Sequence, residues 1–231
     1  MPVKLAVFDM AGTTVSDNND VANAFQKAFL SKALSVTNAE INPLMGFHKP
    51  TAIRMILEQK GIPFDDRLIT DIHESFVNEM LHFYEHDPGV QPMEGAEDLF
   101  FYLKEHGVLI ALNTGFSRKI AATIINRFQW LERGLVDDFI GSDEVPEGRP
   151  HPYMIAELKN RLGLSGEDIV MKVGDTVVDI KEGRNAGCTY VISVTTGTAA
   201  REELEGHQPT HIVDALSQIP AILNKAFSIY A

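Results

Sequence analysis

Short apolar runs alternate with amphipathic segments along most of the chain. The first run, Val3 to Phe8, is rich in residues that favour β-structure and is followed at once by turn residues, so we expect a buried strand there. Similar runs follow, separated by helical patterns, at 108–113, 138–141, 169–174, 189–194 and 211–213. This alternation predicts an α/β fold with a doubly wound, mostly parallel sheet whose strands all end at one edge.

One interval in this alternation is too long for a simple crossover. The second apolar run begins about 100 residues after the first one ends, whereas a crossover between parallel strands needs about a dozen. A loop near Pro43 separates helical patterns that start at Asp20, Pro50 and Asp66. Asp20 is a suitable cap for the first of them. We therefore predict an all-helical cap over 17–89, inserted into a core formed by 1–16 and 90–231.

Charge and composition narrow the classes of partner. The formal net charge of −12 argues against nucleic acid, which binds clustered Lys and Arg. No apolar run approaches the roughly 18 residues that span a bilayer, so we expect no membrane partner. Because the first strand is expected to start at Val3, we expect no secretory signal before it and a cytoplasmic location. Cys188 is the only cysteine, which excludes an intrachain disulfide.

Polar residues follow several of the expected strands. Asp9 stands directly after the first strand, where a carboxylate faces the crevice in which open α/β sheets bind ligands. In the turn that follows, Gly12 lets the chain turn tightly and Thr13 offers a hydroxyl to an anion. Asp9 alone is modest evidence, because Asp commonly starts turns. Three further stretches are expected at the same edge: ALNTG (111–115), GRPHP (148–152) and VGDTVVD (173–179).

Together these four stretches, in this order and spacing, resemble the haloacid dehalogenase superfamily. The resemblance implies that Asp9 is a nucleophile that accepts a phosphoryl group. It also implies a Mg²⁺ ion held by the Asp9 carboxylate, the Ala11 backbone carbonyl and Asp175, with Asp179 behind them. Without the resemblance, Asp175 is typical of a helix N-cap and Asp179 of a helix-surface charge.

The resemblance assigns further residues to the phosphoryl group itself. Thr114, with the backbone N–H groups around Gly115 and Phe116, would hold phosphoryl oxygens at the entrance of the helix that Ser117 begins. Arg149 would add a positive charge. Taken alone, Thr114 is an ordinary strand-end residue and Arg149 a solvated loop residue, so both assignments depend on the motifs around them.

Within the superfamily, the DxAGT form of the first motif is similar to phosphonoacetaldehyde hydrolase and its phosphonatase-like relatives. Most phosphatases of the superfamily carry a second Asp at the position of Ala11, and an ester needs such an acid to protonate its alkoxide leaving group. Cleavage of a carbon–phosphorus bond needs an electron acceptor instead. A protonated imine can accept the electrons as an enamine, and an imine requires a lysine.

Lys49, in the stretch MGFHK, matches the cap lysine that forms this imine in the phosphonatase branch, with Met45 and Gly46 also in place. To attack an aldehyde, its amine must be partly neutral. Burial against Met45 and Phe47, or a neighbouring cation, would lower its pKa accordingly. A lysine taken at random is more commonly a surface residue with its charge in water.

The chain departs from phosphonatase at two positions near the aldehyde. Ala52 stands where that enzyme has a His, and Phe116 stands where it has an aromatic hydroxyl. His48, directly before Lys49, is a candidate replacement for the missing imidazole, although a lone loop His is more commonly solvated. Both departures are shared with the phosphonatase-like relatives.

Three functions remain open on this evidence. The first is a Mg²⁺-dependent hydrolase that cleaves the C–P bond of phosphonoacetaldehyde or a close 2-oxoethylphosphonate. The second is a phosphomonoesterase for a small phosphate such as phosphoglycolate, against which Ala11 argues. The third is a non-catalytic binding protein, against which the retained carboxylates argue: Asp9, Asp175 and Asp179.

The helical pattern that ends at His86 carries two further candidates. His82 and His86 share a helix face with Asp87 nearby, which is a possible metal site without a further obvious ligand. Several apolar residues of this helix are expected to pack against cap helices or a second subunit, which makes a homodimer through the cap possible: Met80, Leu81, Phe83 and Tyr84.

Overall fold

The computed structural model describes residues 3–228, and the predicted α/β architecture is confirmed. Six strands form one sheet in the order β3-β2-β1-β4-β5-β6, and every neighbouring pair is parallel. The strands are β1 (Val3–Phe8), β2 (Leu109–Thr114), β3 (Asp138–Gly141), β4 (Ile169–Gly174), β5 (Tyr190–Val194) and β6 (His211–Val213). The chain builds β2 and β3 on one side of β1 and then crosses to β4, so the topological switch point lies between β1 and β4.

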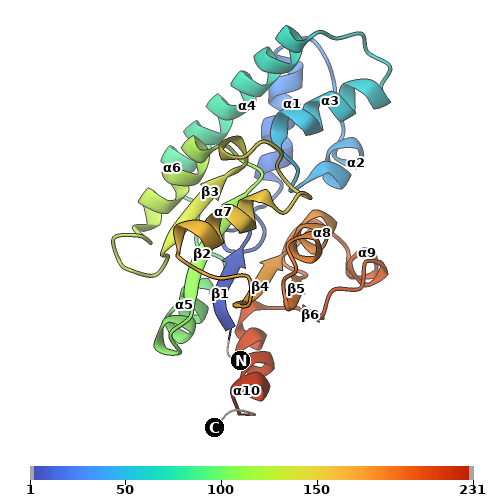
Figure 1. Ribbon diagram of the computed structural model, residues 1–231. Coiled ribbons are helices and arrows are strands. Elements are labelled where there is room, and N and C mark those ends of the chain that lie inside the picture. The colour runs from blue at the N-terminus through green and yellow to red at the C-terminus, as the bar shows by residue number, and fades with distance from the viewer. Residues whose placement is uncertain (1–2, 229–231) are drawn as a thin grey trace.

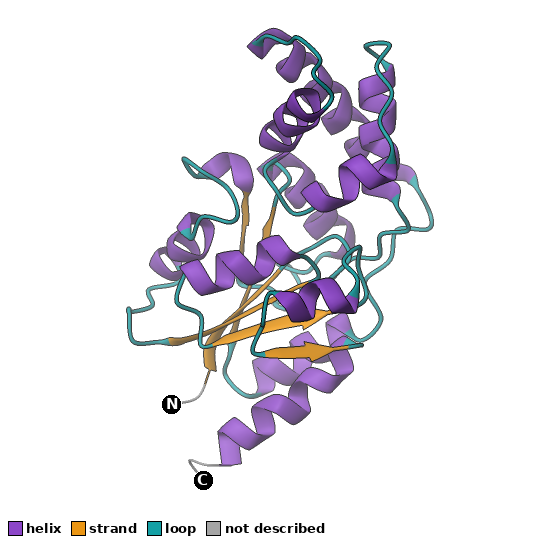
Figure 2. Ribbon diagram, turned by 90° about the vertical axis from the view of Figure 1, so that its right-hand side faces the viewer, coloured by secondary structure: helices purple, strands orange, loops and turns teal. Residues whose placement is uncertain are grey.

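Helices cover both faces of the sheet (Figure 2). Successive residues of β1 point to opposite faces, with Phe8 in one apolar cluster and Val7 in the other. One face packs against α5 (Ala96–Glu105), α6 (Arg118–Phe128) and α10 (Ile219–Ser228). The other packs against α7 (Tyr153–Arg161), α8 (Val177–Asn185) and α9 (Arg201–Gly206). Two single turns of 3₁₀-helix complete this part: η2 (Ser142–Glu144) and η3 (Leu216–Gln218).

Between β1 and α5 the described chain contains only helices, which lie above the C-terminal edge of the sheet (Figure 1). They are α1 (Asp20–Leu30), α2 (Asn38–Ile41), η1 (Asn42–Leu44), α3 (Lys49–Gln59) and α4 (Asp66–His86). The prediction of a loop near Pro43 is thus wrong in part, because α2 and η1 lie in this segment. The signal was a capping box, in which Glu40 Oε2 accepts the Thr37 N–H at 2.7 Å.

The cap of α1 also differs from the prediction. Asp20 does not cap this helix; instead Asp17 Oδ1 accepts the backbone N–H groups of Asp20 at 2.7 Å and Val21 at 3.2 Å. Asn19 stands between them at a φ of 66°. Asp17 therefore caps α1 from a position before its first turn. Only Asp17 Oδ1 is used in this cap, so Oδ2 is available for other contacts.

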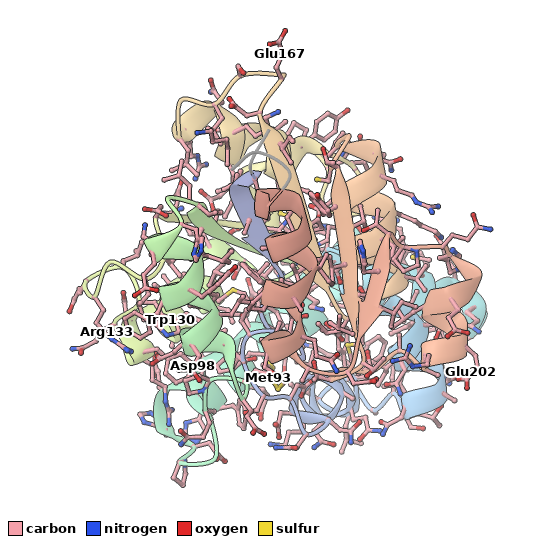
Figure 3. All side chains as sticks on the ribbon, turned by 90° about the horizontal axis from the view of Figure 1, so that it is seen from below. Met93, Asp98, Trp130, Arg133, Glu167 and Glu202 are labelled. Carbon is pink, nitrogen blue, oxygen red and sulfur yellow. The ribbon has the colours of Figure 1, made fainter. Side chains whose placement is uncertain are left out.

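Helix α4 links the helices between β1 and α5, called here the insert, to the helices that cover the sheet. Its length carries it down beside α6 (Figure 1), where Arg127 donates to the carbonyl oxygens of Tyr84 at 2.7 Å and Asp87 at 2.6 Å. Charged side chains otherwise project from the periphery, as Arg133, Glu167 and Glu202 do in Figure 3. No described helix combines the length and the apolar character needed to cross a bilayer.

Candidate active site

The carboxylates predicted from the strand ends meet at the switch point of the sheet. Phe8 of β1 pairs with Val173 of β4, so Asp9 and Asp175, which follow these strands closely, are neighbours. Oxygen atoms of Asp9, Asp175 and Asp179 all lie within 4.8 Å of one another, and all three side chains are buried. Among the described residues, no other group of three or more possible ligands comes this close together.

The electrostatics of these carboxylates suit a divalent cation. Burial and then the charges of Asp9 and Asp179 raise the pKa of Asp175 well above its usual range. Burial also raises the pKa of Asp9, although Arg149 opposes the change. At Asp179 burial acts in the same direction, but Lys172 and Arg149 lower the pKa overall. Repelling carboxylates in a dry crevice are the oxygen ligands that Mg²⁺ prefers, so the residues present fit this ion.

The chain approaches Asp175 closely from two sides. A Cβ on Gly12, whose φ is 85°, would lie 2.8 Å from Asp175 Oδ2, and a Cβ on Gly197 would overlap the same carboxylate. Thr13 Oγ1 donates to Asp175 Oδ1 at 2.9 Å, and the Thr198 N–H donates to Oδ2 at 3.1 Å. The anion that accepts the hydrogen bond of the Thr13 hydroxyl in this structure is thus the Asp175 carboxylate, and a contact of Thr13 with substrate stays a prediction.

Arg149 is fully buried beside the nucleophile candidate. Its Nη2 donates to Asp9 Oδ1 at 2.5 Å and to the Asn113 carbonyl oxygen at 3.0 Å, and its Nη1 donates to Asp179 Oδ1 at 2.6 Å. Burial alone would lower the pKa of Arg149, but the carboxylates raise it, so the guanidinium stays charged. The sequence placed Arg149 on the phosphoryl group, whereas the structure pairs it with the carboxylates.

A second buried cation was not singled out from the sequence. Lys172 Nζ donates to Asn113 Oδ1 at 2.6 Å and pairs with Asp179 Oδ1 at 3.0 Å and Glu182 Oε2 at 3.1 Å. Asn113 Nδ2 in turn donates to Glu182 Oε1 at 2.8 Å. A lysine inside the apolar strand β4 was the available signal, because a buried charge needs partners.

Lys49, the first residue of α3, lies on the opposite side of the crevice with only 3% of its surface exposed. Its Nζ lies 5.1 Å from the ring centroid of Phe116, 5.4 Å from that of Phe25 and 5.9 Å from that of Phe76. Burial, followed by the charge of Arg149, lowers the pKa of Lys49 to about 8. The sequence led us to expect the Phe47 ring beside this amine. The rings that surround it are instead those of Phe25, Phe76 and Phe116.

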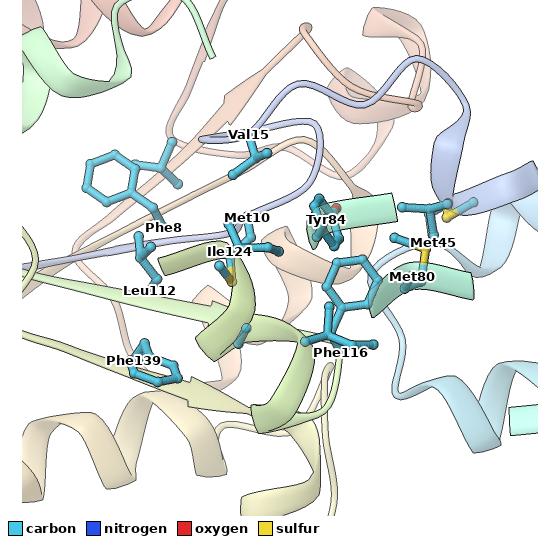
Figure 4. Packing of buried hydrophobic residues seen from close by; sticks show 14 of the residues in the cluster. Phe8, Met10, Val15, Met45, Met80, Tyr84, Leu112, Phe116, Ile124 and Phe139 are labelled. Atoms are coloured by element: carbon cyan, nitrogen blue, oxygen red, sulfur yellow. The ribbon is translucent and has the colours of Figure 1, made fainter. Parts of the chain in front are cut away.

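The rings around Lys49 come from both parts of the chain. Phe116 belongs to the loop after β2 and packs beside Tyr84, Met80 and Met45 of the insert (Figure 4). A Cβ on Gly115 would lie 2.6 Å from the Gly46 carbonyl oxygen, so the two loops touch. The loop after β2 and the loop before Lys49 thus form one continuous wall.

A small cavity of about 20 Å³ lies between these walls, close to the space that one water molecule needs. Most of the predicted site residues line it: Asp9, Ala11, Met45, Lys49, Thr114, Gly115, Phe116 and Asp175. Thr13, Arg149 and Asp179 stand behind it. Five lining residues were not assigned from the sequence as parts of the site: Asp17, Val21, Gly46, Thr176 and Thr198.

The histidine candidates lie elsewhere. His48 does not line the cavity, and its Nδ1 contacts Thr51 Oγ1 at 3.1 Å, so it does not stand in for the missing imidazole in this structure. His82 and His86 are both exposed, with ring centroids 4.9 Å apart. No third ligand among the described residues joins them in a metal-binding group.

Residues 6–193, most of the chain, match the model of the haloacid dehalogenase-like hydrolase family. The chain belongs to this family. Among curated proteins it is similar to the phosphonoacetaldehyde hydrolase of Bacillus cereus strain B4264, with 30% identity over 220 residues that cover 89% of this chain and 82% of that protein. The enzyme of the same name from B. cereus strain ATCC 14579 is 31% identical over 209 residues, which cover 86% and 78%.

Solved structures of the haloacid dehalogenase-like fold agree with this assignment. A phosphonoacetaldehyde hydrolase-like protein from Oleispira antarctica superposes with a TM-score of 0.83 at 21% identity, covering 97% of this chain and 92% of that one. A predicted phosphoglycolate phosphatase from Haemophilus somnus gives 0.77 at 21% identity, covering 95% and 97%. At this identity the likeness concerns the fold, whereas the curated relatives confirm a hydrolase with resemblance to the phosphonatase branch.

Proposed function

We propose that this hydrolase cleaves the carbon–phosphorus bond of phosphonoacetaldehyde or a close 2-oxoethylphosphonate. The observation that supports it most is the buried amine of Lys49, which has no ion pair or hydrogen bond among the described residues and lines the same cavity as Asp9. A substrate with a phosphoryl group at one end and an aldehyde at the other would place the phosphoryl group at Asp9 and the aldehyde carbon at Lys49. The relatives named phosphonoacetaldehyde hydrolase support the same choice.

On the core side, Asp9 attacks the phosphorus. Arg149 holds Asp9 Oδ1 at 2.5 Å, which fixes the carboxylate and leaves its other oxygen to attack. Thr114 and the backbone around Gly115 bind the phosphoryl oxygens. Asp9, the Ala11 carbonyl oxygen and Asp175 would hold Mg²⁺, which when bound neutralises charge on the phosphoryl oxygens.

On the insert side, Lys49 supplies the electron acceptor. With a pKa of about 8, a useful fraction of its amine is neutral at physiological pH and attacks the aldehyde carbon. The carbinolamine loses water to give a protonated imine. When the C–P bond breaks, its electrons move into the new C=C bond of an enamine, and phosphorus is transferred to Asp9.

The test is chemical trapping of the imine. With phosphonoacetaldehyde present, borohydride should reduce the imine to a secondary amine on Lys49, located by peptide mass. Lys49→Arg keeps the charge but should give no adduct and no phosphate release, while Lys27→Arg, on the exposed face of α1, should behave as wild type. Full turnover by Lys49→Arg, or by wild type in excess EDTA, would refute the mechanism.

Phosphate-ester hydrolysis is the second candidate, favoured by one observation. The cavity contains Asp17, a carboxyl that could protonate an alkoxide in the absence of an acid at Ala11. If phosphoglycolate is turned over faster than phosphonoacetaldehyde and Lys49→Arg leaves that rate unchanged, the esterase is the main activity.

A cavity of about 20 Å³ is too small for either substrate, so we propose that the insert opens about the segments near residues 17 and 88. Hydrogen exchange at the loop before Lys49 should slow when Mg²⁺ and orthovanadate are bound together. An exchange rate that does not change when Mg²⁺ and orthovanadate bind would contradict this opening.

A further inference from the structure

Forming an imine requires a proton donor that the residues assigned so far do not supply. A carbinolamine expels its hydroxyl as water only if that oxygen receives a proton, and the reverse step needs a base to take a proton from the attacking water. Ala52, one turn after Lys49 on α3, is buried and has no group to offer. His48 lies outside the cavity.

The side chains that line the cavity leave one group for this task. Asp9 and Asp175 are the nucleophile and metal-ligand candidates, and the remaining polar side chains apart from Lys49 are Thr hydroxyls, which do not titrate near neutral pH. Asp17 is the third carboxyl of the lining, and it forms no ion pair among the described residues.

Asp17 is held in a fixed position. Its Oδ1 accepts the N–H groups of Asp20 and Val21 at the start of α1, so the carboxyl cannot swing away from the cavity without uncapping that helix. Val21, which follows in the same turn, also lines the cavity. Asp17 thus lines the same cavity as Lys49, from the segment just before α1.

The surroundings of Asp17 raise its pKa from the ordinary value. Burial raises the pKa of Asp17, with the nearby charge of Asp20 adding to the rise, while two backbone N–H bonds and Lys49 oppose it. The buried Tyr84 is the other titratable group that senses the Asp17 charge, and its own pKa is raised, so it stays neutral. A carboxyl whose pKa is raised by burial gives up and takes back a proton more readily than one in water.

On the basis of the proposed function, we infer that Asp17 is the proton-transferring residue for the imine at Lys49. Protonated Asp17 gives its proton to the carbinolamine hydroxyl, the C–O bond breaks, water leaves, and the nitrogen lone pair forms the C=N bond of the protonated imine. After C–P cleavage and protonation of the enamine carbon by solvent, water adds to the imine carbon. The Asp17 carboxylate takes the proton from this water, which restores the acid.

The test compares two substrates in Asp17→Asn, because Asn caps a helix as well as Asp but transfers no proton. The expected result is about a 10²-fold or greater loss in phosphonoacetaldehyde turnover and in the rate of borohydride trapping. Hydrolysis of p-nitrophenyl phosphate, whose leaving group needs no acid and whose cleavage needs no imine, should stay within about twofold. Asp17→Ser, a second capping residue, should repeat the pattern.

The matched control is Asp20→Asn, which removes a carboxyl from the same turn but not from this cavity. It removes only a minor contribution to the raised pKa of Asp17, so it should leave turnover of p-nitrophenyl phosphate unchanged and lower turnover of phosphonoacetaldehyde far less than Asp17→Asn does. Trapping at the wild-type rate in Asp17→Asn overturns the inference and leaves the proposed function standing, as does an equal loss on both substrates, which would show a general effect on the site. Absence of any adduct in wild type overturns the proposed function itself and the Asp17 role with it.

Discussion

Two buried lysines near the active-site crevice differ in their surroundings. Lys172, in β4, has three polar partners within 3.1 Å. Lys49, in α3, is as deeply buried but has no ion pair or hydrogen bond among the described residues, only three aromatic rings at 5.1–5.9 Å. A paired cation offsets the charge of the carboxylates around it, whereas an unpaired one is destabilised in its charged form and therefore more easily made nucleophilic.

The comparison distinguishes a lysine that stabilises the site from a lysine that is available to react with substrate. Lys172 and Arg149 together neutralise Asp179 and Glu182 beneath the reacting carboxylates, and neither lines the cavity. Lys49 does line it, and the desolvation that costs stability is what adjusts its amine for attack. Exchanging each lysine for methionine, which keeps most of the side-chain volume, should therefore change stability in opposite directions.

The largest change is expected for Lys172→Met. It leaves Asp179 and Glu182 buried with less positive charge to balance them, which should lower the free energy of unfolding by about 3–5 kcal/mol. Urea denaturation followed by circular dichroism measures this. A loss below about 1 kcal/mol would show that Arg149 alone suffices and that the network is not built around Lys172.

Lys49→Met should act in the other direction. A pKa lowered from 10.5 to about 8 corresponds to roughly 3 kcal/mol of destabilisation of the charged form, which the surrounding rings partly offset. We expect the free energy of unfolding to rise by about 1–3 kcal/mol at pH 7 while phosphonoacetaldehyde turnover disappears. If the variant is less stable than wild type, the aromatic rings bind the cation better than burial penalises it.

Sequence patterns predicted the strands that position the site, but they did not predict every helix and cap around it. The strands were predicted to within about a residue, because each apolar run ends at a turn residue, and the parallel order then placed Asp9 beside Asp175. Short α2 was overlooked, since four residues carry no periodicity. Asp17 and Asp20 are both acceptable caps, and only the fold shows which one accepts the N–H bonds.

Long-range partners explain the remaining misses at the site. Lys172 pairs with Asn113 of β2, which is 59 positions before it, and with Glu182 of α8, the helix that follows β4. Lys49 was expected against Phe47, its neighbour in sequence, but Phe25 and Phe76 of two other helices enclose it. Sequence patterns identify a residue that belongs to a local motif. They do not identify residues from other elements that contact it in the folded structure.

The stability difference between wild type and Lys49→Met should shrink as the pH rises. Between pH 8 and 10.5 the folded wild type releases the Lys49 proton while the unfolded chain retains it, so alkali stabilises wild type relative to the variant. The difference should fall by about 1 kcal/mol per pH unit in this window and stay constant between pH 6 and 7. Paired urea titrations at each pH remove effects common to both proteins, and a difference independent of pH up to 10 would mean that Lys49 keeps its proton.

The smallest change is expected at a lysine that is paired but exposed. Lys27 Nζ lies 3.0 Å from Glu79 Oε2, a distance similar to those of the Lys172 pairs, yet 67% of the Lys27 side chain and 39% of the Glu79 side chain are accessible to water. Water screens this pair and hydrates both charges once it is broken, so Lys27→Met should change the free energy of unfolding by less than about 0.5 kcal/mol. Measured beside Lys172→Met under the same conditions, it separates the effect of pairing from that of burial. A loss at Lys27 comparable to the loss at Lys172 would mean that ion-pair geometry, and not the burial of the carboxylates left behind, sets the stability cost.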